Sequence, residues 1–201
     1  MKKLFAYGGI AASIVMIAFA IGSITTGALG INEVRDNLAQ EQIAFGKAAD
    51  DPAVPAKYSE EQVNTGAEAR AFAKMMRVHA LEASNGLVYA EMGRFLAKPD
   101  APKAATDGNG GTSDEKYALI DEKSGEPASN PARNLWVTET ALSTALNTAF
   151  FAERVAIFSI VMGVALLLTG IGFFVLTLGG ALGMVTLPRH EKKALKTASA
   201  L

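Results

Sequence analysis

The side chains best suited to chemistry lie close together in the middle of the chain. His79 and Glu82 are three residues apart in a predicted helix, so both could contact one metal ion. Tyr89, Glu91 and Arg94 follow them. Metal sites in helical bundles need several such carboxylates and histidines, and His79 is the one histidine of the central segment. We therefore expect His79 to be structural, hydrogen bonded to Glu82 or to a backbone carbonyl.

Motifs of known chemistry are absent from the sequence. It contains no GxSxG, no Walker loop, no HExxH and no dinucleotide fingerprint. The glycine-rich run 108–111 lacks the Lys-Ser/Thr pair of a phosphate loop, and the run that opens at Asp107 departs from a calcium loop. We predict no catalytic residue, no cofactor and no metal, and keep His79 and Glu82 as candidates for a metal-dependent enzyme.

Charge is distributed unevenly along the 201 residues, although the net charge is −1. Residues 32–154 carry 13 basic and 19 acidic side chains, whereas the two ends carry six basic residues and one acidic residue. An acidic central segment without a basic patch argues against nucleic acid as a partner. The absence of cysteine excludes disulfides and thiolate metal sites.

Two long uncharged runs, residues 4–31 and 155–187, are the strongest feature of the sequence. About 20 apolar residues suffice for a helix to cross the hydrocarbon core of a bilayer. A cleaved signal peptide is the alternative for the first run, because Lys2 and Lys3 precede it and Ala18-Phe19-Ala20 resembles a cleavage site. The run continues well beyond Ala20, so we predict a retained anchor.

The charges around these runs predict the topology. Cytoplasmic flanks of membrane spans are rich in Lys and Arg, which places both termini in the cytoplasm of a cell-membrane protein. The expected order is a cytoplasmic N-terminus (1–3), a first transmembrane helix (4–31), an extracytoplasmic helical domain (32–154), a second transmembrane helix (155–187) and a basic cytoplasmic tail (188–201).

Glycines in the second span are candidates for helix packing, because small residues let helix backbones approach closely in lipid. They are Gly163, Gly170, Gly172, Gly179 and Gly183. One interpretation is association of the chain with itself or with another membrane protein. The other is a hairpin in which the glycines face the first span of the same chain.

The central segment predicts further helices. Thr65 and Glu68 match a capping box at the start of a helix that ends near Asn85-Gly86. The apolar residues of 87–96 suggest a second short helix, and the composition of 97–131 suggests a flexible loop. Asn130-Pro131 begins a helix that runs without a breaker into the second span, with Leu135 on its apolar face and Trp136 packed in the domain.

Two stretches, HALEASNGLVYAEMGRF at 79–95 and ALNTAFFAERVAIFSIVMGVALLLTGIGFF at 145–174, carry a family resemblance. The chain resembles a group of small, uncharacterised actinobacterial two-span membrane proteins. The resemblance covers most of the chain except 97–131 and implies the same topology. Some members bear the name aromatic ring-opening dioxygenase, which implies an iron site. Two histidines and a carboxylate cannot be supplied on one side of the membrane here, because His190 lies beyond the second span.

These observations predict an all-α membrane protein whose two transmembrane helices continue into a small extracytoplasmic helical bundle. We expect a non-enzymatic accessory or scaffold subunit of the cell envelope. An extracytoplasmic sensor or ligand-binding module that signals through a partner is the alternative, and a metal-dependent enzyme is the second alternative. The expected partners are the lipid bilayer and either a second copy or another membrane protein.

Overall fold

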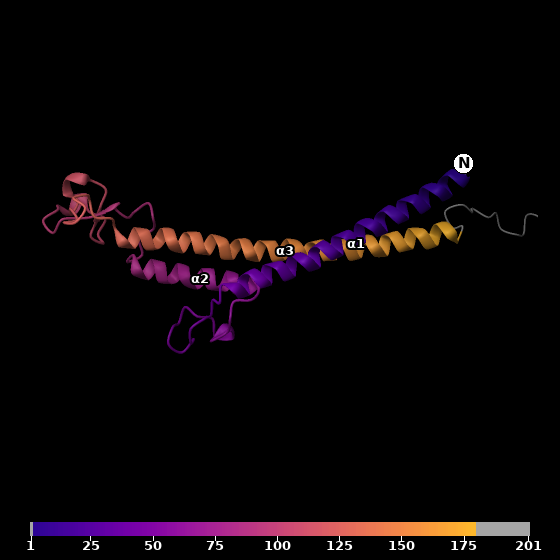
Figure 1. Ribbon diagram of the computed structural model, residues 1–201, viewed down its shortest axis with the longest axis horizontal. Coiled ribbons are helices and arrows are strands. Elements are labelled where there is room, and N and C mark those ends of the chain that lie inside the picture. The colour runs from indigo at the N-terminus through magenta and orange to yellow at the C-terminus, as the bar shows by residue number, and fades with distance from the viewer. Residues whose placement is uncertain (1, 180–201) are drawn as a thin grey trace, which may run out of the picture. The chain divides into compact units, whose positions relative to one another are not determined.

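A computed structural model describes residues 2–179, and its contacts divide the chain into two units. The apolar unit contains residues 2–29 and 156–179, and the polar unit is Gly30–Val155. The described chain is mostly helical, with α1 (Lys2–Gln40), α2 (Gly66–Ala83) and α3 (Pro131–Leu178) as its α-helices (Figure 1). Since α1 and α3 each contribute to both units, the predicted continuation of both apolar runs as helix is confirmed.

The apolar unit consists of two helical segments that are long and apolar enough to cross a membrane. Many of their large apolar side chains, such as Phe19, Phe158 and Leu168, are exposed in the isolated chain. Such a surface is unfavourable in water and favourable in an apolar medium. The prediction of two membrane-length helices is therefore confirmed.

Buried small residues recur every seven positions where α1 and α3 pack together in the apolar unit. They are Ser13, Ala20 and Gly27 on α1, and Ala156, Gly163, Gly170 and Thr177 on α3. A seven-residue repeat keeps one narrow face of each helix against the other over several turns. A Cβ added to Gly27 would lie 2.6 Å from the carbonyl oxygen of Ala156, so the two antiparallel backbones are almost in contact.

The five predicted packing glycines differ in their surroundings. Gly172 is not a packing position in the described chain, because no atom lies within 4 Å of an added Cβ. Gly163 and Gly170 lie against Ala20, Ile24 and Ile17 of the same chain, which is the hairpin arrangement. Gly179 directly follows α3, and the nearest atom to an added Cβ would be the carbonyl oxygen of Val175 in its own helix. Gly183 lies outside the described residues.

Helix α2 begins and ends as its sequence predicts. The hydroxyl of Thr65 accepts a hydrogen bond from the Glu68 amide, and the Glu68 carboxylate accepts one from the Thr65 amide. At the other end, Asn85 and Gly86 have φ angles of 53° and 81°. This left-handed backbone lets the Gly86 amide donate to the carbonyl of Leu81 and terminates the helix.

Side chains from three helices and a connecting segment form the main core of the polar unit. Its fully buried members are Leu38 of α1, Ala69, Ala73 and Met75 of α2, Leu146 of α3, and Phe45, Val54 and Val63 from the chain between α1 and α2. Phe45 stacks on Tyr58 and meets Phe72 edge-on, with ring centroids 5.3 and 5.2 Å away. The first part of α3 thus lies beside α2 (Figure 1).

Trp136 is buried, as predicted, in a second small cluster with Ala80 and Met92. Leu135 was placed on the apolar face of this helix by its spacing, and this prediction is wrong, because its side chain is exposed. The helix directs the larger indole of Trp136, and not the Leu135 side chain, into the core. An arginine of α2, Arg77, covers the indole at 3.9 Å from the ring centroid.

The prediction of a short helix in the segment between α2 and α3 is wrong. Residues 87–96 form no helix; they make turns that end in strand β1 (Phe95–Leu96), which pairs antiparallel with β2 (Gly111–Thr112). Residues 97–131, expected to be a flexible loop, contain β2 and two short 3-10 helices, η2 (Lys103–Ala105) and η3 (Glu115–Tyr117). Another 3-10 helix, η1 (Ala56–Tyr58), precedes α2.

Hydrogen bonds between distant residues give the 97–131 segment its structure. Leu96 donates its amide to Ala128 and accepts at its carbonyl from Leu119, so one strand residue is bound to two parts of the segment. The Asn130 side chain donates to the carbonyl of Gly93. The polar composition of this segment indicates that it buries little apolar surface. It carries no information about hydrogen bonds between residues that are distant in the sequence.

Candidate functional site

One face of α3 carries both apolar and acidic residues toward the core of the polar unit. Glu139, Leu142, Leu146, Ala149 and Glu153 follow one another at alternating spacings of three and four, which places them on one stripe of the helix. Glu139 and Glu153 are 3% and 4% exposed. Buried carboxylates are costly unless each is paired and hydrogen bonded, so these two positions are candidates for a special role.

Glu153 connects all three helices. One carboxylate oxygen lies 3.3 Å from Nε of Arg35 on α1, and the other accepts a hydrogen bond of 3.2 Å from the amide of Gly66, the first residue of α2. A carboxylate at this place also faces the positive end of the α2 dipole. A side chain at Gly66 would collide with Phe150 and Glu153, so the helix start lies directly against α3.

Glu139 has a similar set of partners two heptads earlier. It lies 3.4 Å from Nη1 of Arg77 on α2 and accepts a hydrogen bond of 2.6 Å from the hydroxyl of Ser143. The same hydroxyl is 3.3 Å from the carbonyl oxygen of Ala73. Both glutamates thus join α3 to α2, and polar groups at core positions are known to fix the register of helix pairs.

The sequence reasoning missed both glutamates. Their signal was present, because each lies seven residues from Leu146 on a stripe that is otherwise apolar. A charge at a core position of a helical repeat indicates a partnered residue or a site.

His79 has a different partner from the expected one. Its Nε2 lies 2.8 Å from a carboxylate oxygen of Asp51, which belongs to the segment before α2. Glu82 is exposed, and no bond joins it to His79 within residues 2–179. The prediction of a Glu82 or backbone partner is wrong, because tertiary folding brings a residue 28 positions away to the imidazole.

The other members of the predicted constellation are dispersed. Tyr89 lies under the guanidinium of Arg133, and Glu91 accepts from the amide of Val88 at a turn. Arg94 lies over the ring of its neighbour Phe95. Among residues 2–179, no three acidic or histidine side chains are close enough together to hold a metal ion.

We expect His79→Ala to lower the stability of the polar unit by about 1 kcal/mol, because it removes a partly exposed hydrogen bond. Glu82→Ala is the matched control and should change stability by less than about 0.5 kcal/mol. Thermal unfolding in detergent and elemental analysis of wild type and both variants check this. A transition metal bound near one per chain, and lost in both variants, would restore the metal-site hypothesis.

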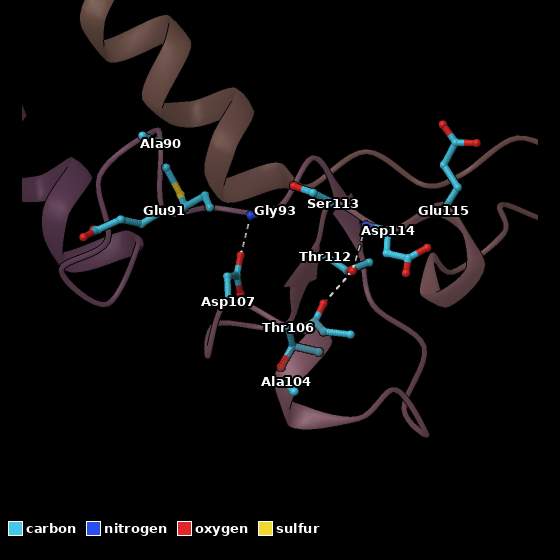
Figure 2. A pocket seen from close by; sticks show the side chains of 12 residues that line it. Ala90, Glu91, Gly93, Ala104, Thr106, Asp107, Thr112, Ser113, Asp114 and Glu115 are labelled. Atoms are coloured by element: carbon cyan, nitrogen blue, oxygen red, sulfur yellow. Dashed lines mark hydrogen bonds between the residues drawn. The ribbon is translucent and has the colours of Figure 1, made fainter.

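A large hollow of the described surface lies beside the turn that contains Asp107. It has a volume of about 810 Å³ and is lined by 90–93, 104–107 and 112–115, including the carboxylates of Glu91, Asp107, Asp114 and Glu115 (Figure 2). Asp107 is engaged by the backbone: it accepts 2.7–2.8 Å hydrogen bonds from the amides of Gly93, Asn109 and Gly111. Its role in the described structure is therefore to hold the turn next to β2.

The protonation of Asp107 should affect stability at acid pH. Burial raises its pKa, but the amides of Gly93, Gly111 and Asn109 together outweigh burial, so its pKa lies below the ordinary 3.8. A lowered folded-state pKa stabilises the fold fully above the unfolded-state value, and this contribution is lost as pH falls through the folded-state value.

We expect Asp107→Asn to cost about 1–3 kcal/mol near neutral pH, because an amide nitrogen would face backbone donors. The difference from wild type should shrink only as pH falls below 3.8 and through the lowered folded-state pKa, where wild-type Asp107 also becomes protonated. Thermal unfolding as a function of pH measures it, with Asp100→Asn, at an exposed position, as the control. Equal effects of both variants would contradict the role given to Asp107.

In comparisons with family models, with curated proteins and with solved structures, nothing matches this chain.

Proposed function

We propose that the chain is a non-enzymatic accessory or scaffold protein of the cell envelope, similar to the small actinobacterial two-span proteins that its sequence resembles. Both termini would lie in the cytoplasm and the polar unit outside it. The observation that carries the proposal is that α1 and α3 are unbroken from an apolar, membrane-length segment into a packed polar core. A binding surface on that core would have a firm attachment to the bilayer.

The sensor hypothesis is the second candidate, and a specific feature favours it. α1 and α3 are continuous helices held together at backbone distance in the apolar unit and joined by Glu153 in the polar unit. A sensor needs a covalent link between its ligand-binding part and its spans, and each of these continuous helices supplies one. The two candidates differ in the partner, which would carry an output domain for a sensor.

The absence of cysteine provides a clean test of topology. We expect Ser113→Cys, at an exposed position of the polar unit, to react with a membrane-impermeant thiol reagent in intact cells. Ser199→Cys, in the basic tail, should react only after the membrane is permeabilised. The cysteine-free wild type is the control. Labelling in the reverse order would overturn the proposed location of the polar unit.

Partners are tested separately by purification in mild detergent, followed by mass spectrometry and size measurement. A homo-oligomer, or one membrane protein recovered in constant proportion, supports a scaffold or accessory role. A partner with a cytoplasmic kinase or other signalling domain favours the sensor. A monomer that recovers no partner from intact cells after cross-linking contradicts both.

A further inference from the structure

A basic cleft lies in the polar unit between the segment before α2, α2 itself and the middle of α3, around Phe150 and Arg154. Its volume is about 500 Å³. Lys57, Arg70, Lys74 and Arg154 surround it, and the apolar lining includes Met75 and Phe150. We call it the basic cleft below.

The charge of this cleft is unusual for its surroundings. Residues 32–154 contain more acidic than basic side chains, yet no carboxylate lines the cleft. Within residues 2–179, none of its four cations forms an ion pair. The nearest acid along the chain, Glu153, is already bound to Arg35 and Gly66. Four like charges around one cavity repel one another, and a bound anion removes that repulsion.

Aromatic rings hold some of these cations in place. The guanidinium carbons of Arg70 and Arg154 lie 4.6 and 5.1 Å from the centroid of one ring, Phe150. The ammonium group of Lys57 lies 4.2 Å from the centroid of Tyr58. Stacking restricts the side chains without using their hydrogen-bond donors, so the donors stay available for phosphate oxygens.

The position of the cleft along α3 indicates the source of the anion. Arg154 is the last charged residue before the uncharged stretch from Val155 to Leu178, and Phe150 lies about 6 Å before it along the helix axis. Basic and aromatic side chains at the end of a membrane span lie at the depth of the lipid headgroups. Apolar residues such as Met75 and Phe150 suit the glycerol and upper acyl region.

We propose that the basic cleft binds the phosphate headgroup of an anionic phospholipid of the outer leaflet. This inference rests on the proposed function for the location of the polar unit. Its four cations neutralise the phosphodiester and any further anionic group, and its apolar lining takes the adjoining part of the lipid. The occupancy of the cleft would thereby depend on the lipid composition next to the two spans.

The test uses the full chain purified in a neutral detergent. Phosphatidylglycerol, phosphatidylcholine and inorganic phosphate are titrated separately, and the midpoint of thermal unfolding is followed. Wild type should be stabilised by phosphatidylglycerol much more than by phosphatidylcholine. Arg70→Gln with Lys74→Gln should weaken the apparent affinity for phosphatidylglycerol about tenfold or more, because each cation contributes substantially to binding an anionic surface.

Lys116→Gln with Lys123→Gln is the matched control, since it removes the same charge from exposed positions outside the cleft. The control should keep wild-type affinity, and Lys57→Gln provides a second cleft variant on a different segment. Equal losses in the cleft and control variants, or no preference of wild type for phosphatidylglycerol, overturn the proposal. Equal stabilisation by inorganic phosphate at the same concentration would overturn the lipid as the source of the anion.

Failure of this inference and failure of the proposed function are distinguishable. Lipid affinity is measured in detergent and does not depend on the side of the membrane, whereas thiol labelling in cells reports only the side. Labelling of Ser113→Cys from the cytoplasm would remove the outer leaflet from the proposal. If the thiol labelling supports the proposed topology but phosphatidylglycerol does not bind, the lipid site is ruled out and the topology stands.

Discussion

Replacement of Gly163 by leucine is expected to force α1 and α3 apart in the apolar unit, whereas the same replacement of Gly172 should leave them packed. A Cβ at Gly163 would lie 2.9 Å from the carbonyl oxygen of Ala20 and 3.0 Å from the amide nitrogen of Ile24. Both are backbone atoms, which cannot rotate away as a side chain can. At Gly172, no atom lies within 4 Å of an added Cβ.

The expected cost of Gly163→Leu is about 1–3 kcal/mol or more, as for other substitutions that overfill a packed interior. It is measured as a lower midpoint of thermal unfolding in detergent. Alanine gives a graded version of the test: Gly172→Ala should be neutral or stabilising, because alanine favours helix by about 1 kcal/mol. Gly163→Ala should lose that gain to the collision with α1.

The size of the purified particle separates this interpretation from association. Suppose that Gly163→Leu leaves the midpoint of thermal unfolding unchanged but reduces the size of the oligomer. Gly163 would then serve contacts between chains and not the packing of α3 on α1. Gly163 and Gly170 already contact α1 in the described chain. Association with another copy or membrane protein, which we continue to propose, therefore needs a different face of the spans.

Local signals predicted the elements that local chemistry determines. The uncharged runs, the Thr65–Glu68 capping box and the Asn85-Gly86 stop each depend on residues within a few positions, and the structure contains all of them. Pro131 likewise begins α3. Such signals act through backbone geometry and nearby hydrogen bonds, so a single sequence is enough to read them.

The segment from Leu87 to Asn130 was not predictable in the same way. Its strands have two residues each, which is too short for a periodic pattern. Its order depends on pairs such as Leu96 with Ala128 and Asp107 with Gly93, which are far apart in sequence. The hydrogen bond between His79 and Asp51 was not predicted for the same reason. Asp51 lies 28 residues away, in a loop whose sequence does not indicate a contact with α2.

The sequence contains a seven-residue spacing of small residues in α3, and only part of it was recognised as a packing pattern. Gly163 and Gly170 were identified as small residues, yet their repeat also includes Ala156 and Thr177. The same interval relates Glu139, Leu146 and Glu153 in the polar unit. The two series are offset by three residues, as the two core positions of a heptad pattern are, so α3 follows a seven-residue pattern in both units, with close packing in one and buried charge in the other.

Replacement of Glu153 by alanine is expected to destabilise the polar unit strongly, at about 3 kcal/mol. The side chain of Glu153 is 6% exposed and bonds Arg35 of α1 and the Gly66 amide of α2. Removing one member of a buried ionic network costs about 3–5 kcal/mol. The lower end applies here, because the side chain of Arg35 is 52% exposed and can return to water.

Most of the loss should come from the Gly66 amide, which is left buried without an acceptor. A double-mutant cycle with Arg35→Ala tests this division: Arg35→Ala alone should cost about 1 kcal/mol or less, as for exposed ion pairs. Glu153→Ala should remain strongly destabilising in the Arg35→Ala background. Glu153→Gln should lie between wild type and alanine, because its single amide oxygen can accept from one of the two donors only.

Glu33→Ala is the control, since Glu33 is an exposed acid on α1 close to Arg35 in sequence. It should change stability by less than about 0.5 kcal/mol. Thermal unfolding gives the size of each effect, and hydrogen exchange gives its place. We expect faster exchange in the first turn of α2 in Glu153→Ala, because that turn loses the carboxylate that accepts from its first amide. If Glu153→Ala is no more destabilising than Glu33→Ala, then Glu153 has no part in joining the three helices, and α2 is held on α3 by apolar packing and by the contacts of Glu139.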